Sequence, residues 1–185
     1  MAIVNGDFYN LGDPKGTVLG TQVSNGQLMK TAGGGWKLTY GLTKTNEFFI
    51  DELNYTMTVG ANDYVISTIN DARGQDKLIL YTTSFGEKTG TNEYGSEILL
   101  KPVNGDWETL SNYENVVCEV VSNTPSKLAG GLVVPKGHIV LSGHGPGSVF
   151  VNTTKKGDKL TVKISKPKGK TGTVYDVKEA IGTPY

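Results

Sequence analysis

Glycine most constrains what this sequence can fold into, because it supplies 25 of the 185 residues and recurs along the whole chain. Between the glycines lie short apolar runs, several of them alternating with polar residues. Glycine adopts the positive φ angles of tight turns and weakens helix interiors, so this pattern favours strands joined by turns over helices. We therefore expect a mainly β fold with mixed, twisted sheets, hairpins and one or two short helices.

Two Asn-Gly pairs mark the clearest turns. Asn25-Gly26 and Asn104-Gly105 each separate two apolar stretches, and Asn-Gly supplies the φ angles of a two-residue hairpin turn. We expect hairpins there, made by residues 17–23 with 27–29 and by residues 97–103 with 106–110. Further strands are expected at residues 2–4, 36–40, 47–50, 53–59, 64–69, 77–83, 115–121 and 159–166, with a strand, a turn and a strand in 132–142.

One helix is expected near the end of the chain, at residues 175–181, with Asp176 as its N-cap and Gly182 as its C-cap. The sequence shows neither an internal repeat of fixed period nor a linker. A chain of this length can bury about 70% of its unfolded surface as one domain. We therefore expect a single strand-rich domain over residues 1–185.

The charges balance, with 18 basic and 18 acidic residues. No overall field draws such a chain to nucleic acid or to anionic lipid, so neither is an expected partner. No apolar run is long enough to span a bilayer, and no signal peptide is found. Because the first residues already have a strand pattern, we expect the chain to be a piece of a longer protein whose targeting segment lies elsewhere.

The sequence lacks the residue patterns that several kinds of chemistry require. Cys118 is the only cysteine, which excludes an internal disulfide and a cysteine-based zinc cluster. His138 and His144 match no metal-ligand pattern, and there is neither a nucleophile elbow nor a phosphate-loop lysine. We expect no metal and no cofactor. Candidate acid–base carboxylates lie apart in loops, and the spacing leaves open which of them converge: Asp7, Asp13, Asp71, Glu93 and Glu97.

The opening stretch is the candidate functional centre. A short apolar strand ends at Asn5-Gly6, and Asp7 and Phe8 follow. An amide, an exposed backbone and a carboxylate at the end of a buried strand can point into a pocket from a rigid support. The alternative interpretation is an ordinary turn, since Asn-Gly is common in turns.

Several short motifs follow one another along nearly all 185 residues. They are Val4-Asn5-Gly6-Asp7-Phe8-Tyr9, Gly12-Asp13-Pro14-Lys15-Gly16, Ser24-Asn25-Gly26, Asn70 with Arg73, Leu80-Tyr81-Thr82, residues 89–97, Pro135-Lys136-Gly137, residues 140–145, residues 157–160 and residues 177–182. In this order the motifs resemble the phosphodiester glycosidase family, which includes the lysosomal "uncovering enzyme", N-acetylglucosamine-1-phosphodiester α-N-acetylglucosaminidase.

The resemblance implies an α+β parent fold and a sugar-phosphate ligand. Family members continue into an Arg-Thr-Ala stretch and an Asp-Gly-Gly-Gly stretch that are thought to line the catalytic pocket, and neither is present here. The chain therefore resembles the first half of the domain, and we expect little or no turnover from it alone. Family members are often secreted or located at the cell surface.

The same resemblance suggests roles for individual residues. The backbone amides of Asn5 and Gly6, with the charge of Arg73, would hold a phosphate oxygen. Asp7 would orient a water molecule or a sugar hydroxyl as the catalytic group. Further ligand-binding candidates are Phe8, Asn70 and His144. The competing interpretations are that Arg73 forms a surface ion pair and that Asp7 caps a loop.

Two other functions remain open. One is a stand-alone, non-catalytic protein that binds or sequesters a nucleotide or sugar phosphate; it would be cytoplasmic if phage-encoded. The other is a structural β-module of a surface or virion protein, without a ligand. An incomplete domain can also expose a sheet edge and form a homo-oligomer through it.

Overall fold

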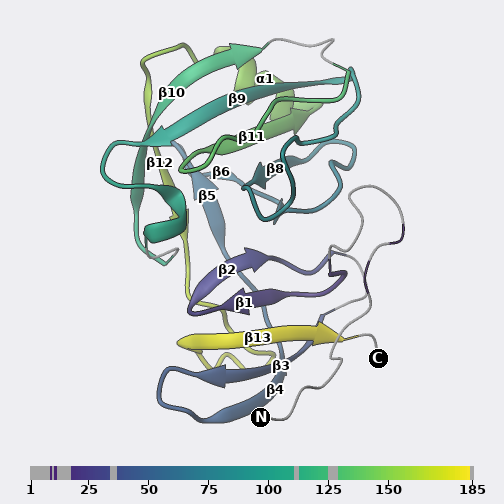
Figure 1. Ribbon diagram of the computed structural model, residues 1–185, viewed down its shortest axis with the longest axis vertical. Helices are drawn as coiled ribbons and strands as arrows, with labels where there is room; N and C mark the ends of the chain where they lie inside the picture. Colours follow the sequence, from purple (N-terminus) through teal and green to yellow (C-terminus); the bar gives the residue numbers. More distant parts are fainter. Residues whose placement is uncertain are drawn as a thin grey trace. The chain divides into compact units, whose positions relative to one another are not determined.

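The computed structural model describes residues 9, 11, 18–33, 37–110, 113–124 and 129–183. The fold is mainly β, as expected, and its strands form twisted sheets (Figure 1). Contacts divide the chain into two compact units: unit 1 comprises Met1–Tyr55 and Lys166–Tyr185, and unit 2 comprises Thr56–Ser165. The expectation of a single domain stays a prediction. The expected strand at residues 2–4 lies outside the described residues.

Unit 1 holds a five-stranded antiparallel sheet in the order β2-β1-β13-β3-β4. The expected hairpin at Asn25-Gly26 is confirmed, because these residues have φ angles of 50° and 76° and join β1 to β2. The strands are β1 (Gln22–Ser24), β2 (Gln27–Lys30), β3 (Leu38–Thr43), β4 (Phe48–Glu52) and β13 (Val177–Thr183).

The expected helix at residues 175–181 is wrong, because this segment forms β13. The strand lies between β1 and β3 and pairs with both (Figure 1), so sheet pairing on two sides overrides the local helical pattern. Asp176 is not a helix cap; its carboxylate pairs with Lys44 and Lys166. Gly182 is not a C-cap either, because it lies within β13 and pairs with Thr39 of β3.

Unit 2 holds an eight-stranded mixed sheet in the order β6-β5-β12-β10-β9-β11-β8-β7, in which β7 and β8 are parallel. The strands are β5 (Met57–Val59), β6 (Tyr64–Val65), β7 (Thr68–Ile69), β8 (Leu78–Tyr81), β9 (Gly95–Pro102), β10 (Val116–Thr124), β11 (Ile139–His144) and β12 (Lys159–Ile164). Helix α1 (Pro146–Thr153) contacts β9 and β11. None of the helices in the described residues has the length and apolarity needed to span a bilayer.

The two faces of this sheet are covered differently. Ser96 on β9 meets Ser148 of α1, with their hydroxyl oxygens 2.8 Å apart. The next residue, Glu97, points to the opposite face. That face carries an apolar cluster in which the ring of Tyr81 packs edge-on against Phe85, with centroids 4.7 Å apart. The face of Glu97 is therefore covered by loops, and it is where unit 2 brings polar side chains together.

The expected hairpin at Asn104-Gly105 is wrong. Residues 106–110 do not form its second strand; Trp107–Thr109 is a 3-10 helix. The reason is tertiary: Trp107 is buried, and the carboxylate of Glu108 accepts hydrogen bonds from the Thr83 hydroxyl and the Gly137 amide. Strand β9 pairs instead with β10 and β11.

Other expected strands are shorter than predicted. Residues 53–59 keep only β5, and residues 64–69 divide into β6 and β7. Within residues 132–134 there is a single bridge, between Val133 and Lys88. The hydrophobic pattern therefore predicted where most strands of unit 2 lie, but not where they begin and end.

Candidate functional site

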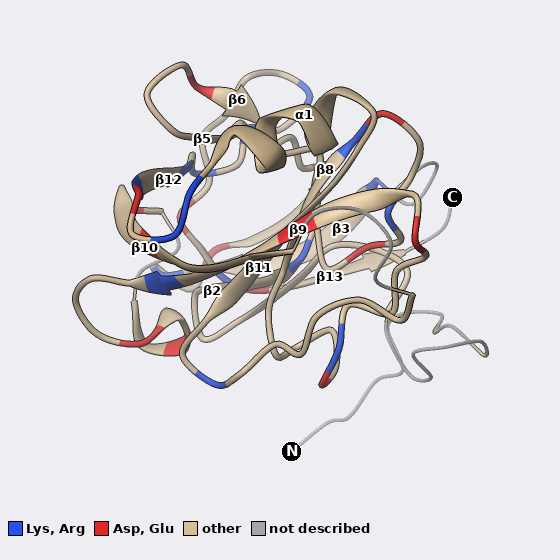
Figure 2. Ribbon diagram, turned by 90° about the horizontal axis from the view of Figure 1, so that it is seen from above, with Lys and Arg blue, Asp and Glu red and all other residues tan. Residues whose placement is uncertain are grey.

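Arg73 is the only arginine of the sequence, and it lies in the loop between β7 and β8. Acidic and basic positions are interspersed along the described ribbon (Figure 2), so a positive site has to be made locally. The Arg73 guanidinium is half-buried; it donates hydrogen bonds to the Ser142 hydroxyl (3.0 Å) and the Asn92 carbonyl (2.8 Å). It also donates to the side-chain oxygen of Asn92.

All three of these acceptors are neutral. In the part of the chain that the structure describes, no ion pair joins Arg73 to a carboxylate. The described residues therefore do not show the surface ion pair that was the competing interpretation of Arg73. Burial lowers the pKa of the guanidinium, while the charge of Glu97 acts to raise it. Arginine remains protonated even so. Among the described residues, the site thus holds a positive charge with no carboxylate within ion-pair distance.

His144 lies on the strand next to the part of β9 that the Arg73 guanidinium covers. His144 of β11 is paired with Gly95 of β9, and a β-carbon on Gly95 would collide with Arg73 Nη1. The guanidinium therefore lies directly over Gly95. Since paired residues of neighbouring strands share a face, the structure places Arg73 and His144 at the same end and on the same side of β9 and β11.

The histidine is held in one tautomer by its neighbour. The backbone N–H of Asp76 donates to His144 Nδ1 at 3.1 Å. This bond leaves the proton of the neutral imidazole on Nε2. The Asp76 carboxylate lies 3.6 Å from Nδ1. The side chain of His144 is 28% exposed, so a ligand can reach it.

Glu97 is the buried anion of the same region. It is 3% exposed, and its carboxylate accepts hydrogen bonds from the hydroxyls of Thr89 (2.9 Å) and Thr91 (2.8 Å) and from the Leu132 amide (2.6 Å). Gly131, with φ +70°, allows this packing, because a β-carbon there would collide with the Thr89 hydroxyl. With its lone pairs used in this way, Glu97 is suited to fixing the loops and not to moving a proton.

Asn70 supports the loop that carries Arg73. Its side chain is buried and bonds both the hydroxyl and the amide of Thr82. The remaining candidates, Asn5, Gly6, Asp7 and Phe8, lie outside the described residues, so their roles stay predictions.

Three members of this site were not singled out as ligand residues from the sequence. They are Ser142, Asn92 and Glu97, of which only Glu97 was named, as one of five scattered carboxylates. The signal that could have marked Asn92 is its place in the loop of residues 89–97, which contributed to the resemblance. Among the described residues, no group of three or more His, Cys, Asp or Glu side chains could hold a metal ion.

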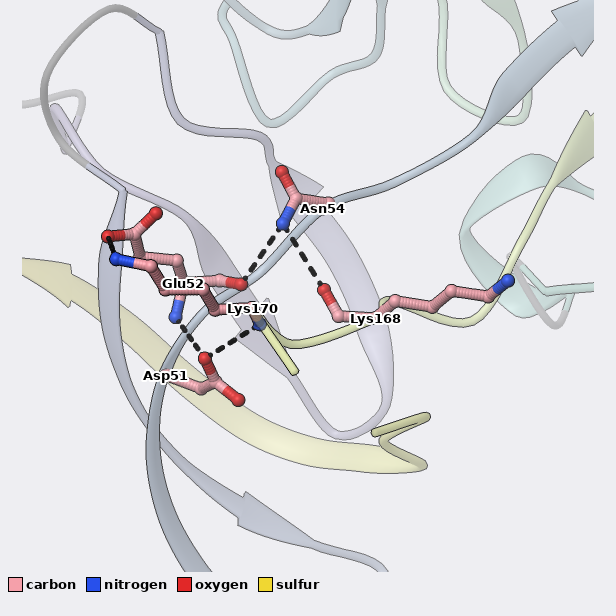
Figure 3. Close-up of polar contacts among 5 residues, drawn as sticks. All are labelled: Asp51, Glu52, Asn54, Lys168 and Lys170. Carbon is pink, nitrogen blue, oxygen red and sulfur yellow. Dashed lines mark hydrogen bonds and ion pairs between the residues drawn. The ribbon is translucent and has the colours of Figure 1, made fainter. Parts of the chain in front are cut away.

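A second polar cluster lies in unit 1 (Figure 3). The Asp51 carboxylate accepts hydrogen bonds from the amides of Glu52 (2.7 Å) and Lys170 (3.0 Å) and from the Tyr175 hydroxyl (2.9 Å). Burial acts to raise the pKa of Asp51, but these hydrogen bonds together hold it below its ordinary value. Asn54 and Lys168 pair nearby through their backbones. The cluster fastens β4 to residues 168–175, which is a structural role.

Comparisons with known proteins identify the fold and not the function. No family model and no curated protein matches the sequence. A hypothetical protein from Synechocystis has a similar structure, with a TM-score of 0.62, 13% identity and coverage of 97% of this chain and 31% of that chain. A protein from Burkholderia pseudomallei K96243 gives a TM-score of 0.62 and 16% identity over 98% of this chain and 41% of its own. The chain therefore spans less than half of each of these proteins and shares their fold.

Proposed function

We propose that this chain binds the phosphate group of a sugar phosphate, of the N-acetylglucosamine phosphodiester type, at Arg73. The observation that carries the proposal is a half-buried guanidinium whose contacts in the described residues are all neutral oxygens. A phosphate oxygen is a stronger acceptor than a hydroxyl or an amide oxygen, and arginine matches phosphate geometry. A phosphate would therefore share or replace the present acceptors.

The neighbours of Arg73 suit such a ligand. The Ser142 hydroxyl lies 3.0 Å from the guanidinium, and His144 carries its neutral proton on Nε2, so both can donate to further phosphate oxygens. Glu97 offsets part of the positive charge without contacting Arg73. We therefore expect selective but modest affinity for a phosphate group.

The resemblance to the phosphodiester glycosidases supplies the sugar part of the proposal. In that family the reaction would also need Asp7 and the stretches that follow this half of the domain. We propose that the chain binds such a ligand with little or no turnover. The non-catalytic alternative is favoured by Glu97. Among the described residues it is the buried carboxylate whose charge acts on Arg73, and it is already bonded to Thr89, Thr91 and Leu132.

Calorimetry with N-acetylglucosamine 1-phosphate tests the proposal. We expect saturable binding that weakens at least about tenfold in Arg73→Gln, because a charge-assisted contact is lost. Arg73→Lys should retain part of the affinity, and Lys101→Gln, an exposed lysine of β9, should bind as the parent does. Equal binding of N-acetylglucosamine without phosphate, or unchanged binding by Arg73→Gln, would contradict the proposal.

A second measurement separates an enzyme from a binder. The chain is incubated with N-acetylglucosamine in phosphodiester linkage, and the released sugar is measured. Turnover that Asp7→Asn abolishes would identify a complete catalytic site. Binding without turnover would identify a non-catalytic protein, and a parallel titration with cyclic nucleotides would show whether the ligand is a nucleotide instead.

A further inference from the structure

Part of one face of the unit 1 sheet is apolar and exposed. Leu38, Tyr40, Leu42, Phe48, Ile50 and Ile181 share this side of β3, β4 and β13, and we call it the Tyr40 face. Tyr40 pairs with both Ile50 and Ile181, and Leu42 pairs with Phe48. Tyr40, Phe48 and Ile50 are 39%, 66% and 53% exposed. Three large apolar side chains thus lie next to one another in solvent.

The other face of the same sheet already forms its core. Val23, Phe49 and Ala180 point to that side and are buried, and Phe49 stacks on Tyr175 with ring centroids 4.3 Å apart. An antiparallel sheet with one buried face normally has polar side chains on the other. A contiguous exposed apolar patch indicates a binding surface.

The Tyr40 face contains a shallow hollow of about 370 Å³, a volume within the usual range for small-ligand sites. Its apolar lining includes Tyr40, Leu42 and Phe48. The rings of Tyr40 and Phe48 are 6.4 Å apart and inclined at 31°, so they lie side by side and leave ring surface for a ligand. The polar lining comes from Gln22, Ser24 and Glu179 on β1 and β13.

The charge of the hollow limits what can bind there. Glu179 is the one charged residue of its lining, and one of its carboxylate oxygens accepts a hydrogen bond from the Asn25 amide. A carboxylate repels phosphates and other anions but accepts hydrogen bonds from hydroxyl and amide N–H groups. The hollow is therefore suited to an uncharged ligand that has both donors and an apolar surface.

A second copy of the chain, joined by adding a strand at an edge of this sheet, is a less suitable partner than a small ligand. Strand β4 is one of the two edge strands of the sheet, with β2 at the other side, and the end of β4 is covered by residues 168–170 (Figure 3). Asn54 pairs with Lys168 through its backbone, and the Asp51 carboxylate bonds the Lys170 amide. Within the described residues, the part of the β4 edge that stays open is short, around Phe48 and Ile50, and short or covered edges disfavour pairing between chains.

We propose that the Tyr40 face binds an uncharged oligosaccharide. A pyranose has an apolar C–H face and a rim of hydroxyls. Its apolar face would lie on the rings of Tyr40 and Phe48, and its hydroxyls would donate to Glu179 and exchange hydrogen bonds with Gln22 and Ser24. This site is independent of Arg73 and of the proposed phosphate ligand.

Nuclear magnetic resonance of the full chain tests the proposal, with N-acetylglucosamine tetramer and cellotetraose as probes at millimolar concentration. We expect one probe or both to shift amide signals of β1, β3, β4 and β13. Phe48→Ala should weaken binding about tenfold, and Phe48→Trp should retain it, because an aromatic surface is kept. Val149→Ala on α1, which removes an equally exposed apolar side chain, should have no effect.

Three further outcomes bear on this proposal. Arg73→Gln should leave oligosaccharide binding unchanged, which separates this site from the phosphate site. Absence of shifts with both probes would overturn the proposal. So would self-association that sedimentation detects and Phe48→Asp abolishes, if neither sugar changes it, since the Tyr40 face would then be an interface between copies.

Discussion

Asn70 and Thr82 hold each other by two hydrogen bonds. The Asn70 amide group donates to the Thr82 hydroxyl at 2.7 Å, and the Thr82 backbone N–H donates to the Asn70 side-chain oxygen at 2.8 Å. Both residues are buried, and Asn70 has a φ of 55°, which asparagine tolerates better than most residues. The pair closes the segment that contains Arg73, so the shape of the candidate site depends on it.

Replacing Asn70 should separate the contribution of its side-chain hydrogen bonds from that of its positive φ angle. Asn70→Ala leaves the Thr82 amide without its partner and keeps a β-carbon at positive φ, so we expect a loss of roughly 2–4 kcal/mol in the free energy of unfolding. Asn70→Gly loses the same hydrogen bonds but tolerates the φ angle, so its loss should be smaller. Urea unfolding measures both, with Asn104→Ala in an exposed turn as the control. Equal losses in the two variants would show that the backbone angle contributes nothing.

Gly95→Ala should disturb the Arg73 site directly. The new β-carbon would collide with the guanidinium and with the Gly143 carbonyl, so we expect both lower stability and weaker phosphate binding. Gly74→Ala is a suitable control, because its nearest neighbours are the flexible end of the Lys77 side chain. Urea unfolding and calorimetry give the two results. A Gly95→Ala variant that binds phosphate like the parent would show that the guanidinium can move without consequence.

The sequence predicted the parts of this fold that depend on local pattern. Asn25-Gly26 has the φ angles its residue types favour, and the alternation in residues 159–166 marks β12. Residues 175–181 show the limit of local pattern. Their helical spacing is overridden by pairing with β1 and β3, two strands distant in sequence from them.

The candidate site was predictable only in part, for the same reason. Arg73 and His144 were both named from the sequence, and the structure places them at the same end and on the same side of β9 and β11. This placement follows from the pairing of His144 with Gly95, a register that no local pattern contains. The neighbours of Glu97 were likewise hidden, because Leu132 is 35 residues away from it.

Acid should weaken unit 1 through Asp51. Burial opposes ionisation of this carboxyl, but hydrogen bonds from Lys170, Tyr175 and Glu52 lower its pKa in the folded state. A lowered folded pKa gives stability that is fully present above the unfolded pKa of about 3.9 and is lost as the pH falls through the folded pKa. We therefore expect the free energy of unfolding to decrease below about pH 4.

The Asp51→Asn variant isolates this effect. Its free energy of unfolding should be lower than that of the parent at neutral pH, and the difference should shrink in acid, as measured by urea unfolding across the pH range. Glu119→Gln, at an exposed position of β10, should follow the parent. A constant difference at every pH would mean that the ionisation of Asp51 contributes nothing to stability.

The thiol of Cys118 should be inert in the folded chain. Cys118 lies fully buried in β10, and burial raises the pKa of its thiol to about 12. Since the thiolate is the reactive form, a disulfide reagent such as dithionitrobenzoate should modify Cys118 only when unit 2 opens. We expect slow modification of the native chain near neutral pH and one equivalent of rapid modification in urea, with a rate that follows the unfolding transition. Fast modification without denaturant would mean that β10 opens readily between β9 and β12, and that the central sheet is far less stable than its buried residues indicate.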